Sequence, residues 1–235
     1  MENERRRFLA ATITLGIGTL AASNFPIRAA DQARDDKKDQ PEEEVSAPED
    51  LMREHGVLNR ILLIYEEGLR RLRDQEEVTP DVFHKPALLV RQFVEDYHEK
   101  LEENFIFPEF EKRQKLVGLV RVLREQHQAG RKVTDVILRN AAADRFRKED
   151  ARHDLVAACR GFIRMYRPHE AREDTVLFPA LHGIVPAKRL KELGEQFEKE
   201  EDRLFGQEGF EKTVEQVAAI EKQLGIYDLA QFTAK

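Results

Sequence analysis

Apolar positions recur with a helical period along most of the chain from residue 51 to residue 224. In the first segment they alternate at spacings of four and three residues. This stripe consists of Leu51, Leu58, Leu62, Tyr65, Leu69 and Leu72. It predicts an amphipathic helix, for which Ser46 and Asp50 are candidate N-terminal caps. His55 takes the place on the stripe between Leu51 and Leu58, where an apolar residue is typical.

Three further segments show the same period. The second begins after Thr79-Pro80-Asp81, and its inner face includes Phe93, Tyr97, His98, Leu101, Glu102 and Phe105. The third has an inner face of Leu116, Val120, Leu123, His127, Gly130, Thr134 and Ile137. The fourth spans about residues 152–181, with Val156, Cys159, Phe162, Ile163, Tyr166, His169, Glu173, Val176 and Leu177 inward. Four such helices with short connections predict an all-α fold, an antiparallel four-helix bundle.

Residues 184–235 extend beyond this bundle as two further amphipathic patterns, separated by Gly206 and Gly209. Their apolar positions are Leu190, Leu193, Phe197 and Leu204, and then Val214, Val217, Ile220 and Leu224. We expect this helical extension either to cover the bundle or to bind a protein partner. The predicted organisation is an export signal (1–30), a polar linker (31–48), the bundle (49–183) and the extension (184–235).

The first 30 residues have the pattern of an export signal. Arg5-Arg6-Arg7-Phe8-Leu9 precedes a weakly apolar run from Ala10 to Ala22, which resembles the Arg-Arg-x-Phe-Leu pattern of bacterial twin-arginine signals. The run is shorter than the ~20 residues that a membrane-spanning helix needs. We therefore expect an exported, periplasmic protein whose mature form does not span a membrane; an uncleaved membrane anchor is the alternative.

Charge and cysteine content exclude several classes of function. The net charge is −6 with both signs interspersed, so no basic stripe indicates a nucleic-acid surface. The single cysteine, Cys159, excludes an internal disulfide framework and a multi-thiolate metal site. We expect Cys159 to be a small core residue.

A repeated stretch carries the candidate chemistry. The sequence HEKLEENFIFP, from His98 to Pro108, returns as HEAREDTVLFP, from His169 to Pro179. Residues i and i+4 share one face of a helix, so His98 pairs with Glu102 and His169 with Glu173. Two such patches that face each other across a bundle outline a site for two metal ions.

Two more histidines join this set, because His55 and His127 lie on the inner faces of the two other helices. Burying imidazoles and carboxylates costs free energy unless something compensates for their lost hydration. A pair of divalent or trivalent ions provides that compensation.

The order His55, His98 with Glu102, His127, then His169 with Glu173 resembles the hemerythrin-like, or HHE cation-binding, family. The resemblance covers roughly residues 49–182. It implies a centre of two non-haem iron ions with the imidazoles as terminal ligands, bridged by Glu102, Glu173 and an oxo or hydroxo group. A free coordination position would bind dioxygen or another small ligand.

The sequence departs from the oxygen carriers of that family on the third helix, where they have two histidines four residues apart. Here Leu123 and Arg131 occupy those spacings around His127. Glu99 is the first candidate for the missing ligand, and water is the second. The oxygen carriers often have the motif HxxxxD on the fourth helix, which would make Asp174 the carboxylate ligand. The match to the first copy of the repeat favours Glu173 instead.

The sequence is compatible with three functions. The first is an exported di-iron protein that binds a small ligand for storage, sensing or protection. The second is a di-iron enzyme of peroxidase or ferroxidase type. The third is a zinc-bound or metal-free bundle that acts through its C-terminal helices.

Overall fold

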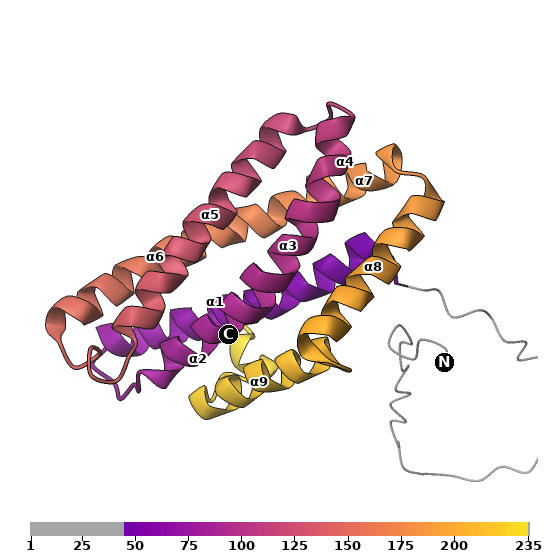
Figure 1. Cartoon of the computed structure of the whole chain (residues 1–235). Helices are drawn as coiled ribbons and strands as arrows, with labels where there is room; N and C mark the ends of the chain where they lie inside the picture. Colours follow the sequence, from indigo (N-terminus) through magenta and orange to yellow (C-terminus); the bar gives the residue numbers. More distant parts are fainter. Residues whose placement is uncertain (1–44, 235) are drawn as a thin grey trace, which may run out of the picture. The chain divides into compact units, whose positions relative to one another are not determined.

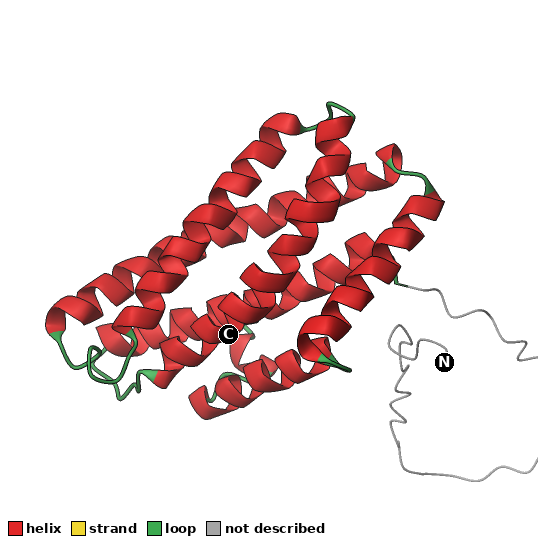
Figure 2. Cartoon of the chain, viewed as in Figure 1, coloured by secondary structure: helices red, strands yellow, loops and turns green. Residues whose placement is uncertain are grey.

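Four helical rods with short connections form the bundle, as Figure 1 shows. The computed structural model describes residues 45–234. In chain order the rods are α1 (Ala47–Arg73); α2 (Asp81–Leu89) continued by η2 (Val90–His98), α3 (Glu99–Leu101), η3 (Glu102–Ile106) and α4 (Phe107–Lys112); α5 (Val117–Asn140); and α6 (Glu149–Arg172) continued by η4 (Glu173–Leu177) and α7 (Phe178–Ile184). The residues that the structure describes contain no strand (Figure 2), so the predicted all-α bundle is confirmed.

The C-terminal residues form α8 (Ala187–Phe205), α9 (Gly209–Leu224) and the short 3₁₀ helix η5 (Leu229–Phe232). The ring of Phe205 packs against Phe93 and Tyr97 of η2, with centroid distances of 5.8 and 5.5 Å. Arg60 of α1 donates from Nε to Oε1 of Glu221 on α9 at 3.0 Å. The extension therefore covers part of the bundle, and a partner-binding role for it stays a prediction.

The first helix begins with a reciprocal cap. The carboxylate of Glu49 accepts hydrogen bonds from the backbone N–H and the hydroxyl of Ser46, both at 2.8 Å. The predicted cap at Ser46 is confirmed, whereas Asp50 lies inside the helix and pairs with Arg53 at 3.0 Å. Because α1 begins at Ala47, its first residues fall inside the range predicted to be a linker.

Most of the inward positions predicted for the four rods are buried, and Leu116 is the clearest error among them. Leu116 is 38% exposed because it precedes α5 in a left-handed conformation, with φ of 47°, so the helical period does not extend to it. Val156, Ile163 and Val176 are only half-buried. On α5 the remaining predicted positions are all buried: Val120, Leu123, His127, Gly130, Thr134 and Ile137.

Both copies of the sequence repeat adopt the same irregular backbone. In each, a π-helical turn of five residues begins at the glutamate, Glu102 in η3 and Glu173 in η4, and an α-helix resumes at the following phenylalanine. Pro108 and Pro179 lie in the first turns of those resumed helices. A proline lacks the N–H that would bond the carbonyl four residues earlier, which favours a change of helical register at this point.

The described residues contain no helix that is both long and apolar enough to cross a membrane. The predicted export signal and the first part of the predicted linker lie outside the described residues.

Candidate metal centre

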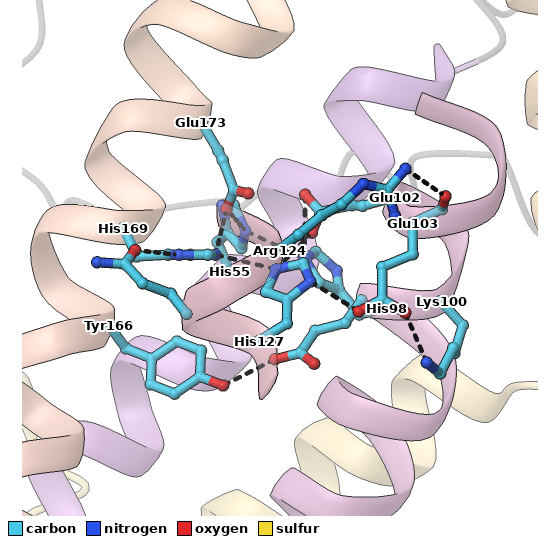
Figure 3. A network of polar contacts seen from close by, with 12 residues as sticks. His55, His98, Lys100, Glu102, Glu103, Arg124, His127, Tyr166, His169 and Glu173 are labelled. Atoms are coloured by element: carbon cyan, nitrogen blue, oxygen red, sulfur yellow. Dashed lines mark hydrogen bonds and ion pairs between the residues drawn. The ribbon is translucent and has the colours of Figure 1, made fainter. Parts of the chain in front are cut away.

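Four imidazoles from four rods converge in the interior of the bundle (Figure 3). Nε2 of His55 lies 3.1 Å from Nε2 of His98. Nε2 of His127 lies 3.2 Å from Nε2 of His169. All four side chains are buried, at most 4% exposed. The histidines therefore form two pairs whose Nε2 atoms point at one small volume.

Glu102 lies between the two pairs. Its Oε1 is 3.8 Å from Nε2 of His98, and its Oε2 is 3.3 Å from Nε2 of His127. Glu173 also reaches both pairs, because its Oε2 lies 3.1 Å from Nε2 of His169 and 3.4 Å from Nε2 of His55. Each carboxylate is thus shared by one histidine of each pair.

Within the part of the chain that the structure describes, the donor atoms of these six side chains form two groups that could each hold a metal ion. One group contains Glu102, His127, His169 and Glu173, and the other contains His55, His98 and Glu102. The donor atoms of each group lie within 4.8 Å of one another. The structure therefore brings together all six residues that the sequence singled out, and Glu102 belongs to both groups.

The charges of the two carboxylates make a cation a good fit. Both glutamates are fully buried, and none of their four oxygens accepts a hydrogen bond from a described residue. Burial and the nearby Glu173 carboxylate raise the pKa of Glu102 well above its ordinary value. Burial alone would raise the pKa of Glu173, but His169 and His55 outweigh it and hold that pKa well below its ordinary value. A bound cation would satisfy these oxygens and allow both groups to be charged.

The outer nitrogens of the first histidine pair contact carboxylates. Nδ1 of His55 lies 2.7 Å from Oδ1 of Asp174, and Nδ1 of His98 lies 2.6 Å from Oε2 of Glu54. Burial lowers the pKa of His55, but the hydrogen bond to Asp174 and the nearby carboxylate of Glu173 outweigh it and raise that pKa to about 10. Burial and the neighbouring His55 lower the pKa of His98 well below its ordinary value.

The second pair is oriented in the same way. Nδ1 of His127 lies 3.2 Å from Oε1 of Glu103, and Nδ1 of His169 lies 2.9 Å from Oε1 of Gln126. Imidazoles that bind metal commonly have such an oxygen partner on the outer nitrogen, which fixes the tautomer with the lone pair on the inner nitrogen. All four inner nitrogens thus face the centre and can act as ligands, His55 after a bound cation displaces the proton that its raised pKa favours.

Glu99, the first candidate for an additional ligand, does not join either group that contains Glu102. Its Oε1 accepts a hydrogen bond from the hydroxyl of Tyr166 at 2.7 Å, and its Oε2 pairs with Arg131 at 2.7 Å. It falls instead in a third group with Glu103 and His127. The geometry therefore assigns Glu99 to the surroundings of the centre, with Tyr166 as its donor.

Sequence patterns missed the partners of the outer nitrogens. Glu54, Glu103 and Gln126 each contact an imidazole that belongs to a different rod, so no local spacing identifies them. Asp174, the alternative ligand on the fourth helix, lies on the outer nitrogen of His55, while Glu173 faces inward. The only feature of the sequence that could identify these partners is their position, because each carboxylate or amide directly precedes or follows an inward-facing residue.

The remaining histidines lie outside these groups. His84 is half-buried in α2, whereas His153 and His182 are exposed. None of the three belongs to a potential metal group among the described residues.

Comparisons with known proteins agree with this geometry. The family model described as the hemerythrin HHE cation binding domain matches residues 46–181, and it matches residues 119–233 a second time. An uncharacterized protein of Mycobacterium tuberculosis, Rv1995, is 47% identical over 218 residues, which cover 93% of this chain and 86% of that protein. An uncharacterized protein of Mycobacterium bovis, Mb2018, matches with the same identity and coverage. No solved structure matches the chain significantly. The chain belongs to the hemerythrin HHE cation-binding domain family.

Proposed function

We propose that this protein binds two iron ions at the six converging residues and, through them, dioxygen or another small ligand. The observation that carries the proposal is the position of Glu102, whose two oxygens face histidines of different pairs. His55 and His98 would hold one ion, and His127 and His169 would hold the other. Glu102 and Glu173 would be shared.

The donor set favours iron. Each ion would have two imidazoles and carboxylate oxygens, a combination that is typical of non-haem iron sites with open coordination positions. No thiolate is available, because Cys159 is buried and belongs to none of the potential metal groups. Iron at such a site supplies reversible electron transfer and coordination of small molecules.

The protein's own contribution is to orient the ligands and to restrict access. The carboxylates of Asp174, Glu54 and Glu103 and the amide of Gln126 hold the four rings in the orientation that points Nε2 inward. The six candidate ligands are buried, so a large substrate cannot contact them directly. This burial supports a ligand of a few atoms, in a storage, sensing or protective role.

The test is metal analysis together with visible spectroscopy of the protein purified in air and titrated with azide. We expect about two irons per chain and absorption bands that shift as azide binds. Glu102→Ala and Glu173→Ala should each lose most of the iron, whereas Glu125→Ala, at an exposed glutamate of α5, should retain it. No bound iron, zinc in its place, or equal iron in all three variants would contradict the proposal.

We also propose that the protein is exported after it folds, with Arg5 and Arg6 as the twin-arginine pair. Support comes from the sequence pattern alone. The twin-arginine route carries folded proteins, which would suit a domain that binds its metal before export. Cell fractionation tests this: Arg5→Lys with Arg6→Lys should keep the protein inside the cell, while Arg7→Lys should not. Export of the double variant at the normal level would contradict this route.

A further inference from the structure

A groove of about 450 Å³ lies between α1 and α6. Five arginines line it: Arg70, Arg73, Arg160, Arg164 and Arg167. This is a high local concentration of positive charge in a chain whose net charge is −6. The volume lies within the range of about 300 to 1,000 Å³ that is usual for small-molecule sites. None of the lining residues belongs to a potential metal group.

Three of these arginines already have acidic partners. Arg70 donates to Glu67 at 2.9 Å, and Arg73 donates to Asp74 at 2.7 Å. Arg167 donates to Glu66 at 2.6 Å, which joins α6 to α1 across the groove. The positive charge of these three side chains is therefore largely compensated within the protein.

Arg160 and Arg164 differ from the others. Both are exposed on α6, and neither makes a hydrogen bond or an ion pair with any residue that the structure describes. They are four residues apart, so they lie on the same face of the helix, where like charges repel and weaken it. An anion that contacts both would relieve this repulsion. Guanidinium groups are well suited to a phosphate, because their planar donors form paired hydrogen bonds with its oxygens.

The floor of the groove is apolar. Leu69 of α1 and Ile163 of α6 line it, and both are half-buried. Contact with these side chains would stabilise the organic part of a ligand, which simple inorganic phosphate lacks. We propose that the groove between α1 and α6 binds a small organic diphosphate, with its phosphates on Arg160 and Arg164 and its organic part on Leu69 and Ile163.

Isothermal titration calorimetry of the full chain tests this, with adenosine diphosphate as the probe and inorganic pyrophosphate as the comparison. We expect saturable binding that weakens as salt is added, because salt screens exposed charges. The double substitution Arg160→Glu with Arg164→Glu should lower the affinity for adenosine diphosphate by about tenfold or more. The matched control is Arg139→Glu, an exposed arginine of α5 outside the groove, which should leave the affinity unchanged.

Three results would overturn the proposal. The first is that neither probe binds. The second is that the double variant binds adenosine diphosphate as tightly as the unaltered protein does. The third is that pyrophosphate binds as tightly as adenosine diphosphate. A separate experiment distinguishes a free ligand from a lipid headgroup. It measures co-sedimentation of the protein with phosphatidylcholine vesicles, with and without phosphatidic acid. Binding to the phosphatidic acid vesicles in the absence of any binding to adenosine diphosphate would replace the small molecule by a membrane surface.

Discussion

Nδ1 of His55 and Oδ1 of Asp174 lie 2.7 Å apart, while the neighbouring Glu173 faces the opposite nitrogen of the same imidazole. Two successive acidic residues thus contact the two sides of one ring. The π-helical turn η4 begins at Glu173, at the point where the helix changes register. The proposed ligand and the residue that orients His55 are therefore adjacent in sequence and distinct in role.

This relationship predicts different effects for two conservative substitutions. Asp174→Asn should retain both irons but weaken their binding by about 10- to 100-fold, as is typical when a partner of a metal-binding histidine is changed. Glu173→Gln should lose iron outright, because it removes a charged ligand. Competition with a chelator measures both affinities. Equal losses in the two variants would contradict this division of roles.

Glu99→Gln should leave the iron content unchanged, because Glu99 belongs to neither of the two groups that contain Glu102. The free energy of unfolding should fall, by about 1–3 kcal/mol, because Arg131 loses a charged partner inside the protein. Metal analysis and urea unfolding separate the two effects. Loss of one iron from this variant would make Glu99 a ligand after all.

Gly130→Ala should destabilise the bundle by about 1–3 kcal/mol, the usual cost of overpacking a core. A Cβ at Gly130 would lie 2.0 Å from the hydroxyl oxygen and 2.8 Å from Cζ of Tyr166, which is buried. The matched control is Gly161→Ala on α6, where a Cβ meets nothing within 4 Å. That change should stabilise the protein by about 0.5–1 kcal/mol, because alanine favours a helix. Thermal unfolding compares the two, and equal shifts in the same direction would contradict the packing argument.

Cys159 should not react with thiol reagents in the folded protein. Its side chain is buried, and burial raises the pKa of the thiol far above its ordinary value, so little thiolate forms at neutral pH. The reaction with a chromogenic disulfide should appear only when denaturant unfolds the bundle, at the midpoint seen by circular dichroism. Rapid modification of the native protein would show that this part of α6 opens.

The repeat explains why so much of the centre could be predicted from the sequence. His98 with Glu102, and His169 with Glu173, are encoded by spacing within one helix, and the buried stripes locate His55 and His127. The contacts between rods could not be predicted, because Glu54 meets His98 only through the packing of α1 against η2. The π-helical turns η3 and η4 were not anticipated from the sequence, although Pro108 and Pro179 mark these two. Leu116 was misplaced because a stripe does not show where its helix begins.

We propose that Glu102 lies between two iron ions, and a crystal structure of the iron-bound protein measured at the iron absorption edge tests this most directly. We expect two anomalous peaks per chain, one beside His55 and His98 and the other beside His127 and His169, with one oxygen of Glu102 bound to each. A single peak, or two peaks without Glu102 between them, would contradict the account.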